Sequence, residues 1–211
     1  MTVDPWLVIP VKAPQGSKQR LAARVPEHQR RLLSSVMARR VVRTAAEVWP
    51  RGAMVVVTTD PELAALCRRL EVAVLQDPGS GQTAAVQSGV YHALERGAEV
   101  VATLAADLPR LTAEDLRALL AAARRTGPGT MVLIPDLSGT GSNGMVVRPG
   151  TILLHAFGPD SRRRHLDRAR ALGLRVRELR RTGLARDLDR PGDLLGLDGA
   201  EAALAVEPGD G

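Results

Sequence analysis

The chain has 211 residues and a mass of 22.5 kDa, the size of one large domain. Hydrophobic residues make up 45% and charged residues 25% of the sequence, which excludes disordered and collagen-like classes. The 29 basic and 23 acidic residues leave a net charge of +6, which favours phosphate-bearing partners such as nucleic acid or small anions. Aromatic residues amount to only 2%, which disfavours single-stranded nucleic acid bound by base stacking.

The cysteine count and the lengths of the apolar runs predict the compartment. Cys67 is the only cysteine of the chain and cannot pair internally, so a reducing compartment is expected. No apolar run reaches the roughly 18 residues that indicate a membrane-spanning helix. We therefore expect a cytoplasmic protein without a membrane segment.

Short, β-branched apolar runs alternate with longer amphipathic segments along the chain. Strands are expected at 6–11, 53–58, 72–75, 99–105, 130–135, 144–148 and 175–179. Helices are expected at 27–48, 61–70, 83–96, 112–125 and 161–172, with Pro26 and Pro61 in first turns and a capping box from Thr112 to Asp115. The alternation predicts an α/β fold with a mostly parallel sheet and helices on both faces. One domain is expected over residues 1–197, followed by a flexible tail over 198–211.

The loop after the first strand is rich in positive charge. Ligands of an open parallel sheet bind at the carboxyl ends of its strands, so this loop is a candidate site. It contains Lys12, Lys18 and Arg20, which include both lysines of the chain. These positive charges favour the binding of a phosphate chain, although the sequence contains neither a P-loop nor a dinucleotide-binding glycine pattern. The alternative is an exposed, solvated basic loop.

Carboxylates in two later loops are candidate magnesium ligands. Asp107 follows the expected fourth strand, and Asp187 and Asp189 lie near the end of the domain. Magnesium commonly takes one or two protein carboxylates together with substrate phosphates, which suits these groups. The alternative is that they bond to loop amides or cap a late turn.

A glycine-rich loop between two expected strands is a candidate anion site. In Gly139-Thr-Gly-Ser-Asn-Gly144, the side chains of Thr140, Ser142 and Asn143 offer donors to a phosphate or a carboxylate. The small residues also allow the backbone to approach an anion closely. A plain hairpin turn is the alternative.

The segment Phe157-Gly-Pro-Asp-Ser161 is a second candidate anion site. Ser161 is expected to open a helix whose first amides attract an anionic group. An ordinary N-cap is the alternative. His165, four residues later, is interpreted as a structural or surface imidazole rather than a general base.

Taken together, these loops resemble those of the guanylyltransferases of coenzyme F-420 biosynthesis, which activate 2-phospho-L-lactate or phosphoenolpyruvate with GTP. The resemblance runs from about Val8 to Leu194. It implies a single-domain, Rossmann-like nucleotidyltransferase of the glycosyltransferase-A-like type. The matching motifs are Pro10-Val-Lys12 with Lys18-Gln-Arg20-Leu21, Ala106-Asp-Leu-Pro109, Gly139-Thr-Gly-Ser142, Phe157-Gly-Pro-Asp-Ser161 with His165, and Asp187-Leu-Asp189 before Pro191.

The resemblance also implies roles for particular residues. Asp107 and Asp187 would hold magnesium, and the phosphorylated acid would bind Ser142, Gly158 and Ser161. The catalytic residues would be Lys12, Lys18 and Arg20. The nucleotide would bind Pro10, Lys12, Lys18, Gly81, Gln82 and Thr83. The chain departs from the family pattern at Gly81-Gln-Thr83, where Gly-Leu-Asn is common, and at Ser142-Asn143, where small or hydroxyl residues are usual. It also carries Arg190 where threonine is usual.

The implied reaction transfers GMP from GTP to the phosphate of phosphoenolpyruvate or 2-phospho-L-lactate and releases pyrophosphate. The product would pass to a deazaflavin-coupling transferase, and a homodimer is compatible with this expectation. Two alternatives stay open. The first is a related nucleotidyltransferase whose acceptor is 3-phosphoglycerate, molybdopterin or a phosphosugar. The second is a nucleic-acid-binding protein that uses the arginines between Arg162 and Arg181, which the glycine-rich loops disfavour.

Overall fold

The computed structural model describes residues 4–12, 21–22, 25–148 and 155–188. Within these ranges the strands are β1 (Trp6–Val11), β2 (Met54–Thr58), β3 (Ala73–Leu75), β4 (Val101–Leu104), β5 (Thr130–Pro135), β6 (Ser142–Val147) and β7 (Arg175–Glu178). The helices are α1 (Glu27–Val48), η2 (Arg51–Ala53), α2 (Pro61–Arg69), α3 (Gln82–Glu95), α4 (Ala113–Arg124), α5 (Ser161–Ala171) and α6 (Thr182–Ala185). Every expected strand and helix is present, with ends that differ by at most two residues.

The strands form a seven-stranded sheet in the order β3-β2-β1-β4-β6-β5-β7. Strands β1 to β4 are parallel, β6 runs antiparallel to both β4 and β5, and β7 is parallel to β5. The expected mostly parallel sheet is therefore confirmed. Because β6 is reversed, its first residues lie beside the carboxyl end of β4, where Gly144 pairs with Leu104.

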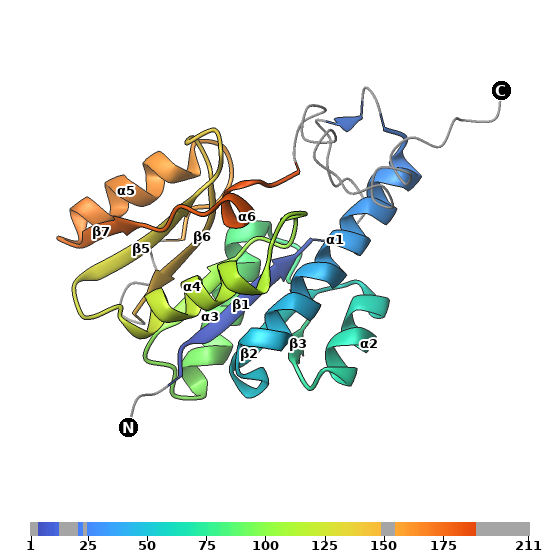
Figure 1. Cartoon of the computed structure of the whole chain (residues 1–211), viewed down its shortest axis with the longest axis horizontal. Helices are drawn as coiled ribbons and strands as arrows, with labels where there is room; N and C mark the ends of the chain where they lie inside the picture. The colour runs from blue at the N-terminus through green and yellow to red at the C-terminus, as the bar shows by residue number, and fades with distance from the viewer. Residues whose placement is uncertain (1–3, 13–20, 23–24, 149–154, 189–211) are drawn as a thin grey trace.

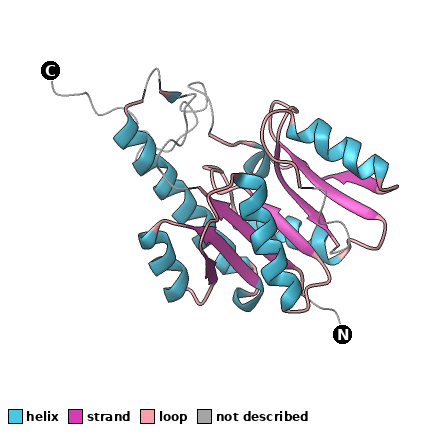
Figure 2. Ribbon diagram, turned by 180° about the vertical axis from the view of Figure 1, so that it is seen from behind, coloured by secondary structure: helices cyan, strands magenta, loops and turns pink. Residues whose placement is uncertain are grey.

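Helices cover both faces of the sheet, as Figure 1 shows and Figure 2 shows from behind. On one face, α1, α2 and α4 contribute to a buried cluster that includes Leu7 and Ile9, alternate residues of β1. On the other face, α3 packs on Trp6 and Val8, and α5 covers the part of the sheet around Met145. Since both faces are buried here, the central strands β1 and β2 are buried at every position rather than at alternate ones.

Three local details complete the comparison with the sequence. The capping box between Thr112 and Asp115 at the start of α4 is confirmed. Pro61 opens α2 as expected, whereas Pro26 is the N-cap of α1 and not a first-turn residue. The short helix α6 has no expected counterpart.

The proposed domain end at residue 197 and the tail lie outside the described residues. In the part of the chain that is described, no helix is long and apolar enough to cross a membrane.

Candidate active site

The carboxyl ends of β1 to β4 meet at one edge of the sheet. The start of β6 joins this edge, because the Ala105 N–H donates to the Asn143 carbonyl oxygen at 2.7 Å. The start of α5 joins it as well, because the Ser142 N–H donates to the Ser161 hydroxyl oxygen at 2.9 Å. The sheet thus brings together most of the loops that the sequence singled out (Figure 1).

The structure brings together the backbone segments that carry the two expected metal ligands. Asp107 follows β4, and Asp187 lies just beyond α6. The Leu188 N–H donates to the Asp107 carbonyl oxygen at 3.1 Å, which joins the two segments. Both aspartates are half-buried. Two carboxylates on adjacent, partly open backbone segments are a donor set that fits a magnesium ion. Asp189, the other acidic candidate, lies outside the described residues.

The segment that carries Asp187 is held against α4 by an ion pair. Arg181 precedes α6, and its guanidinium donates to Asp115 at 2.7 Å and to Glu114 at 2.9 Å. The hydrogen bonds to these carboxylates raise the pKa of Arg181. Asp115 is buried and also accepts the Thr112 hydroxyl hydrogen at 2.7 Å within the capping box. The start of α4 and the start of α6 are therefore fixed through one carboxylate. The sequence marked Asp115 only as a cap and gave Arg181 no role of its own.

Asn143 also holds this segment in place. Its side-chain amide donates to the carbonyl oxygens of Leu184 and Ala185, both at 3.0 Å. The two amide hydrogens are thereby used within the chain. The expectation that Asn143 donates to a bound phosphate or carboxylate is wrong, because its side chain reaches the backbone of α6 instead.

Ser142, Ser161 and His165 form a buried hydrogen-bonded cluster. The Ser142 hydroxyl lies 3.0 Å from Nδ1 of His165, and Nε2 of the same ring accepts the Ala156 N–H at 2.9 Å. Burial lowers the pKa of His165 to about 3, with further lowering from His155 and from the positive charges of nearby arginines. The ring is therefore neutral near pH 7. The structural interpretation of His165 is supported, and the surface interpretation is wrong because the residue is fully buried.

The start of α5 differs from its expected form. Its N-cap is Asp160, in the left-handed conformation, so Ser161 is the first helical residue and not the N-cap. The backbone amides of Ser161 and Arg162 donate to the carbonyl oxygens of Gly158 and Thr140, at 3.1 and 3.2 Å. These two amides therefore already donate hydrogen bonds within the chain. The hydroxyls of Ser142 and Ser161 are the more accessible donors at the start of α5. Gly158 has φ +116°, which a residue with a Cβ rarely adopts.

The residues expected to bind the nucleotide lie at the same edge as far as the structure describes them. Lys12 is exposed directly after β1, Pro10 is buried within β1, and Lys18 and Arg20 lie outside the described residues. Gly81 is the N-cap of α3, and Gln82 and Thr83 are its first residues. The Thr83 hydroxyl accepts the Phe157 N–H at 3.2 Å. The start of α3 is thus joined to the segment that leads to Gly158 and Ser161.

Many of the arginines between Arg162 and Arg181 are bonded within the chain. Arg162 and Arg180 both contact Glu178, and Arg168 donates to a backbone carbonyl oxygen. Burial would raise the pKa of Glu178, but the hydrogen bonds and charges of the two arginines outweigh it and lower the pKa. These contacts disfavour the alternative of a basic face that is open to nucleic acid.

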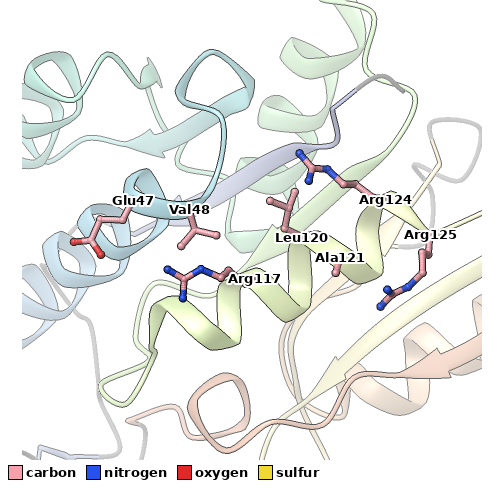
Figure 3. Close-up of a pocket in the computed structure, with 7 residues that line it drawn as sticks. All are labelled: Glu47, Val48, Arg117, Leu120, Ala121, Arg124 and Arg125. Carbon is pink, nitrogen blue, oxygen red and sulfur yellow. The ribbon is translucent and has the colours of Figure 1, made fainter. Parts of the chain in front are cut away.

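A separate hollow of about 400 Å³ lies between α1 and α4. Because α4 starts at the candidate site and runs back toward the start of β5, most of this hollow lies toward the opposite edge of the sheet. Figure 3 shows the residues that line it, which are Glu47, Val48, Arg117, Leu120, Ala121, Arg124 and Arg125. It contains none of the expected site residues.

Comparison with known proteins first defines the class. The MobA-like NTP transferase domain family matches residues 20–181. A putative nucleotide-diphospho-sugar transferase from Desulfovibrio desulfuricans G20 superposes with a TM-score of 0.72 at 16% identity, over 90% of this chain and 84% of that chain. A CMP:2-keto-3-deoxy-manno-octonic acid synthetase complexed with CTP superposes with a TM-score of 0.60 at 14% identity, over 96% and 99% of the two chains. The fold is that of the nucleotidyltransferases.

Sequence comparison then defines the family. The phosphoenolpyruvate guanylyltransferase of Sphaerobacter thermophilus is 39% identical over 193 residues, which cover 91% of each chain. The phosphoenolpyruvate guanylyltransferase of Rubrobacter xylanophilus is also 39% identical over 193 residues, covering 92% of this chain and 93% of that protein. The chain therefore belongs to the family of the phosphoenolpyruvate guanylyltransferases and is a nucleotidyltransferase. The resemblance stated from the sequence motifs is confirmed.

Proposed function

We propose that the protein transfers GMP from GTP to the phosphate of phosphoenolpyruvate or 2-phospho-L-lactate and releases pyrophosphate, in the biosynthesis of coenzyme F-420. The observation that carries the proposal is the close arrangement of two polar groups at one sheet edge. Asp107 follows β4, and Ser142 starts the adjacent strand β6, with the backbones joined by the bond from Ala105 to Asn143. The backbone segments that carry the two aspartates thus adjoin those that carry the two buried serines. The names of the relatives support guanylyl transfer and phosphoenolpyruvate as an acceptor.

The reaction needs no strong base. A phosphate oxygen of the phospho-acid attacks the α-phosphorus of GTP, a new P–O bond forms, and the bond to the oxygen that bridges to the β-phosphate breaks. Pyrophosphate leaves with the bonding electrons. A phosphate monoester with a second pKa of about 6 is already largely ionised at pH 7, so no proton has to be removed. The neutral His165, bonded at both nitrogens, is consistent with this chemistry. The protein contributes positioning and charge neutralisation.

Asp107 and Asp187 are the proposed ligands of a magnesium ion. When bound, the ion would supply positive charge between phosphate groups that otherwise repel each other. Lys12, Lys18 and Arg20 are proposed to neutralise the β- and γ-phosphates of the nucleotide. In the same proposal the rest of the nucleotide lies against Pro10, Gly81, Gln82 and Thr83.

Ser142, Gly158 and Ser161 are the proposed site of the phospho-acid. The two hydroxyls lie together on adjacent elements, and Gly158 sits in the loop that leads into α5. The product joins GMP to the phospho-acid through a reactive phosphoanhydride, so a downstream transferase is expected to consume it; the proposal assigns that role to a deazaflavin-coupling enzyme. We also propose that two copies of the chain form a homodimer.

A mass-spectrometric assay tests the function. The purified full chain is incubated with magnesium and each nucleoside triphosphate, together with phosphoenolpyruvate, 2-phospho-L-lactate, 3-phosphoglycerate or a phosphosugar. The expected result is pyrophosphate release and a GMP-linked product with GTP and one of the first two acids. A product formed only with another acceptor would overturn the proposed substrate. Steeply salt-dependent binding to nucleic acid, with no effect of GTP, would overturn the proposed reaction.

A further inference from the structure

The hydrogen bonds of His165 determine which of its nitrogens carries a hydrogen. The backbone N–H of Ala156 can only donate, so Nε2 of the ring accepts from it at 2.9 Å. A neutral imidazole with Nε2 as the acceptor carries its hydrogen on Nδ1. The Nδ1–H therefore donates to the Ser142 hydroxyl oxygen, 3.0 Å away. The Phe157 ring and the imidazole form a T-shaped contact, with centroids 5.0 Å apart, which helps to fix the orientation of the imidazole.

This direction decides what the two serines can still do. The Ser142 oxygen accepts from His165, and the Ser161 oxygen accepts from the Ser142 N–H at 2.9 Å. Each hydroxyl therefore keeps its own hydrogen for a third group. Among the residues that the structure describes, neither hydroxyl has a further hydrogen-bond partner. Both serines are buried, and a buried donor left without an acceptor is costly. The pair is arranged for a ligand that only accepts.

We propose that His165 is a positioning residue, which directs the Ser142 hydroxyl, beside that of Ser161, at an anionic oxygen of the phospho-acid. This inference rests on the function proposed above. An ionised phosphate or carboxylate can accept from two neighbouring hydroxyl donors, whereas an ammonium group has only hydrogens to donate and cannot accept from them. Arg164 adds positive charge nearby, since its guanidinium donates to the Phe157 carbonyl oxygen directly before Gly158.

The neutral state of the ring keeps this arrangement the same across the working pH range. Burial, followed by the nearby His155 and the arginines, lowers the pKa of His165 to about 3. A protonated ring would turn Nε2 into a donor that faces the Ala156 N–H, so the observed bond requires the neutral form. The imidazole therefore acts on the phospho-acid only through Ser142.

Two substitutions separate this role from simple structural support. In His165→Asn, the amide nitrogen can take the place of Nδ1 and donate to Ser142. In His165→Gln, the amide oxygen can take the place of Nε2 and accept from Ala156. If His165 positions Ser142, the KM for the phospho-acid rises by about 2- to 12-fold in His165→Gln, the range for one hydrogen bond. The KM for GTP stays unchanged, and His165→Asn is the less affected variant. A larger rise in the KM for the phospho-acid in His165→Asn than in His165→Gln would show that His165 acts by holding the Ala156 backbone N–H and not by positioning Ser142.

A double-mutant cycle tests whether the effect passes through Ser142. With phosphoenolpyruvate varied and GTP saturating, His165→Gln is expected to add nothing in a Ser142→Ala background. Independent, additive effects would overturn the inference. His92→Gln is the matched control, because His92 packs on Trp6 at the start of β1, away from the site. Both of its KM values are expected to match those of the unsubstituted protein.

Nuclear magnetic resonance of the protein with ¹⁵N-labelled histidine distinguishes a failure of this inference about His165 from a failure of the proposed reaction. The His165 ring is expected to show the neutral Nδ1–H form between pH 5 and pH 8, and to respond to inorganic phosphate unless Ser142 is replaced by alanine. A ring protonated at Nε2, or one unaffected by phosphate, would overturn the inference even in a fully active protein. If the protein forms no GMP-linked product while the resonance still responds to phosphate, the proposed reaction fails and the anion site stands.

Discussion

Gly183 offers a direct test of how α6 is held against α4. A Cβ at this position would lie 2.0 Å from Oδ2 of Asp115 and 2.6 Å from the Arg110 carbonyl oxygen. An ordinary contact needs at least 3.4 Å, so Gly183→Ala must move α6 or Asp115 by more than 1 Å. Asp115 cannot move freely, because it caps α4 through Thr112 and pairs with Arg181.

The size of the effect follows from these contacts. Overpacking in a tight interior costs about 1–3 kcal/mol, and disruption of a helix cap costs about 0.5–2 kcal/mol. We expect Gly183→Ala to lower the free energy of unfolding by about 3 kcal/mol. In a domain of this size, that corresponds to a fall in Tm of roughly 6–12 °C. Because Asp187 lies just beyond α6, the substitution should also lower kcat at a temperature where the protein remains folded.

Thermal unfolding followed by circular dichroism, and turnover of GTP with phosphoenolpyruvate at 25 °C, measure the two effects. Gly52→Ala is the matched control, since a Cβ there has nothing within 4 Å and should leave Tm nearly unchanged. If Gly183→Ala also left Tm and kcat unchanged, the close packing of α6 on Asp115 and its link to the acidic pair would be refuted.

Four further tests address other parts of the site. Asp107→Asn and Asp187→Asn should each weaken magnesium binding in calorimetry and remove most turnover while the fold is retained; normal binding by both would remove the proposed metal site. Lys18→Ala should raise the KM for GTP and lower kcat, and an effect confined to the phospho-acid would contradict its role. Asn143→Ala removes the donor to the Leu184 carbonyl oxygen and one of the two donors to the Ala185 carbonyl oxygen, which keeps the bond from the Leu137 N–H. It should reduce the urea-unfolding free energy by about 1–3 kcal/mol, whereas unchanged stability would argue against this bond pair. Folding lowers the pKa of His165 from 6.5 to about 3, so between these pH values the unfolded chain binds more protons than the folded one. The contribution of the neutral His165 ring to stability is therefore complete above pH 6.5 and is lost as the pH falls toward 3. Unfolding free energies of His165→Gln should therefore depend less on pH between 6 and 4 than those of the unsubstituted protein, and parallel curves would contradict a neutral buried ring.

The local structure could be predicted from the sequence because its causes are local. Apolar, β-branched runs form buried strands, and the spacing of apolar residues predicts the intervening helices. The capping box at Thr112 depends on residues only three positions apart, so it was visible in the sequence and is present in the structure. The position of Asp107 after an apolar run similarly indicated a strand end, which is where ligands of parallel sheets bind. The family motifs, which are contiguous stretches of sequence, were visible for the same reason.

The partners of the polar groups in the site depended on the tertiary structure. Asn143 reaches the carbonyl oxygen of Leu184, 41 residues away, only because β6 lies next to β4 and α6 returns to the same edge. The spacing of residues in the sequence does not encode that strand order, so the side chain was assigned to a ligand rather than to the backbone. His165 and Ser142 are 23 residues apart, and their bond likewise requires the reversed strand β6 to start beside α5. Residue type and spacing thus identified the chemical groups of this site, whereas the packing of strands and helices decided which groups are used within the chain and which remain for a ligand.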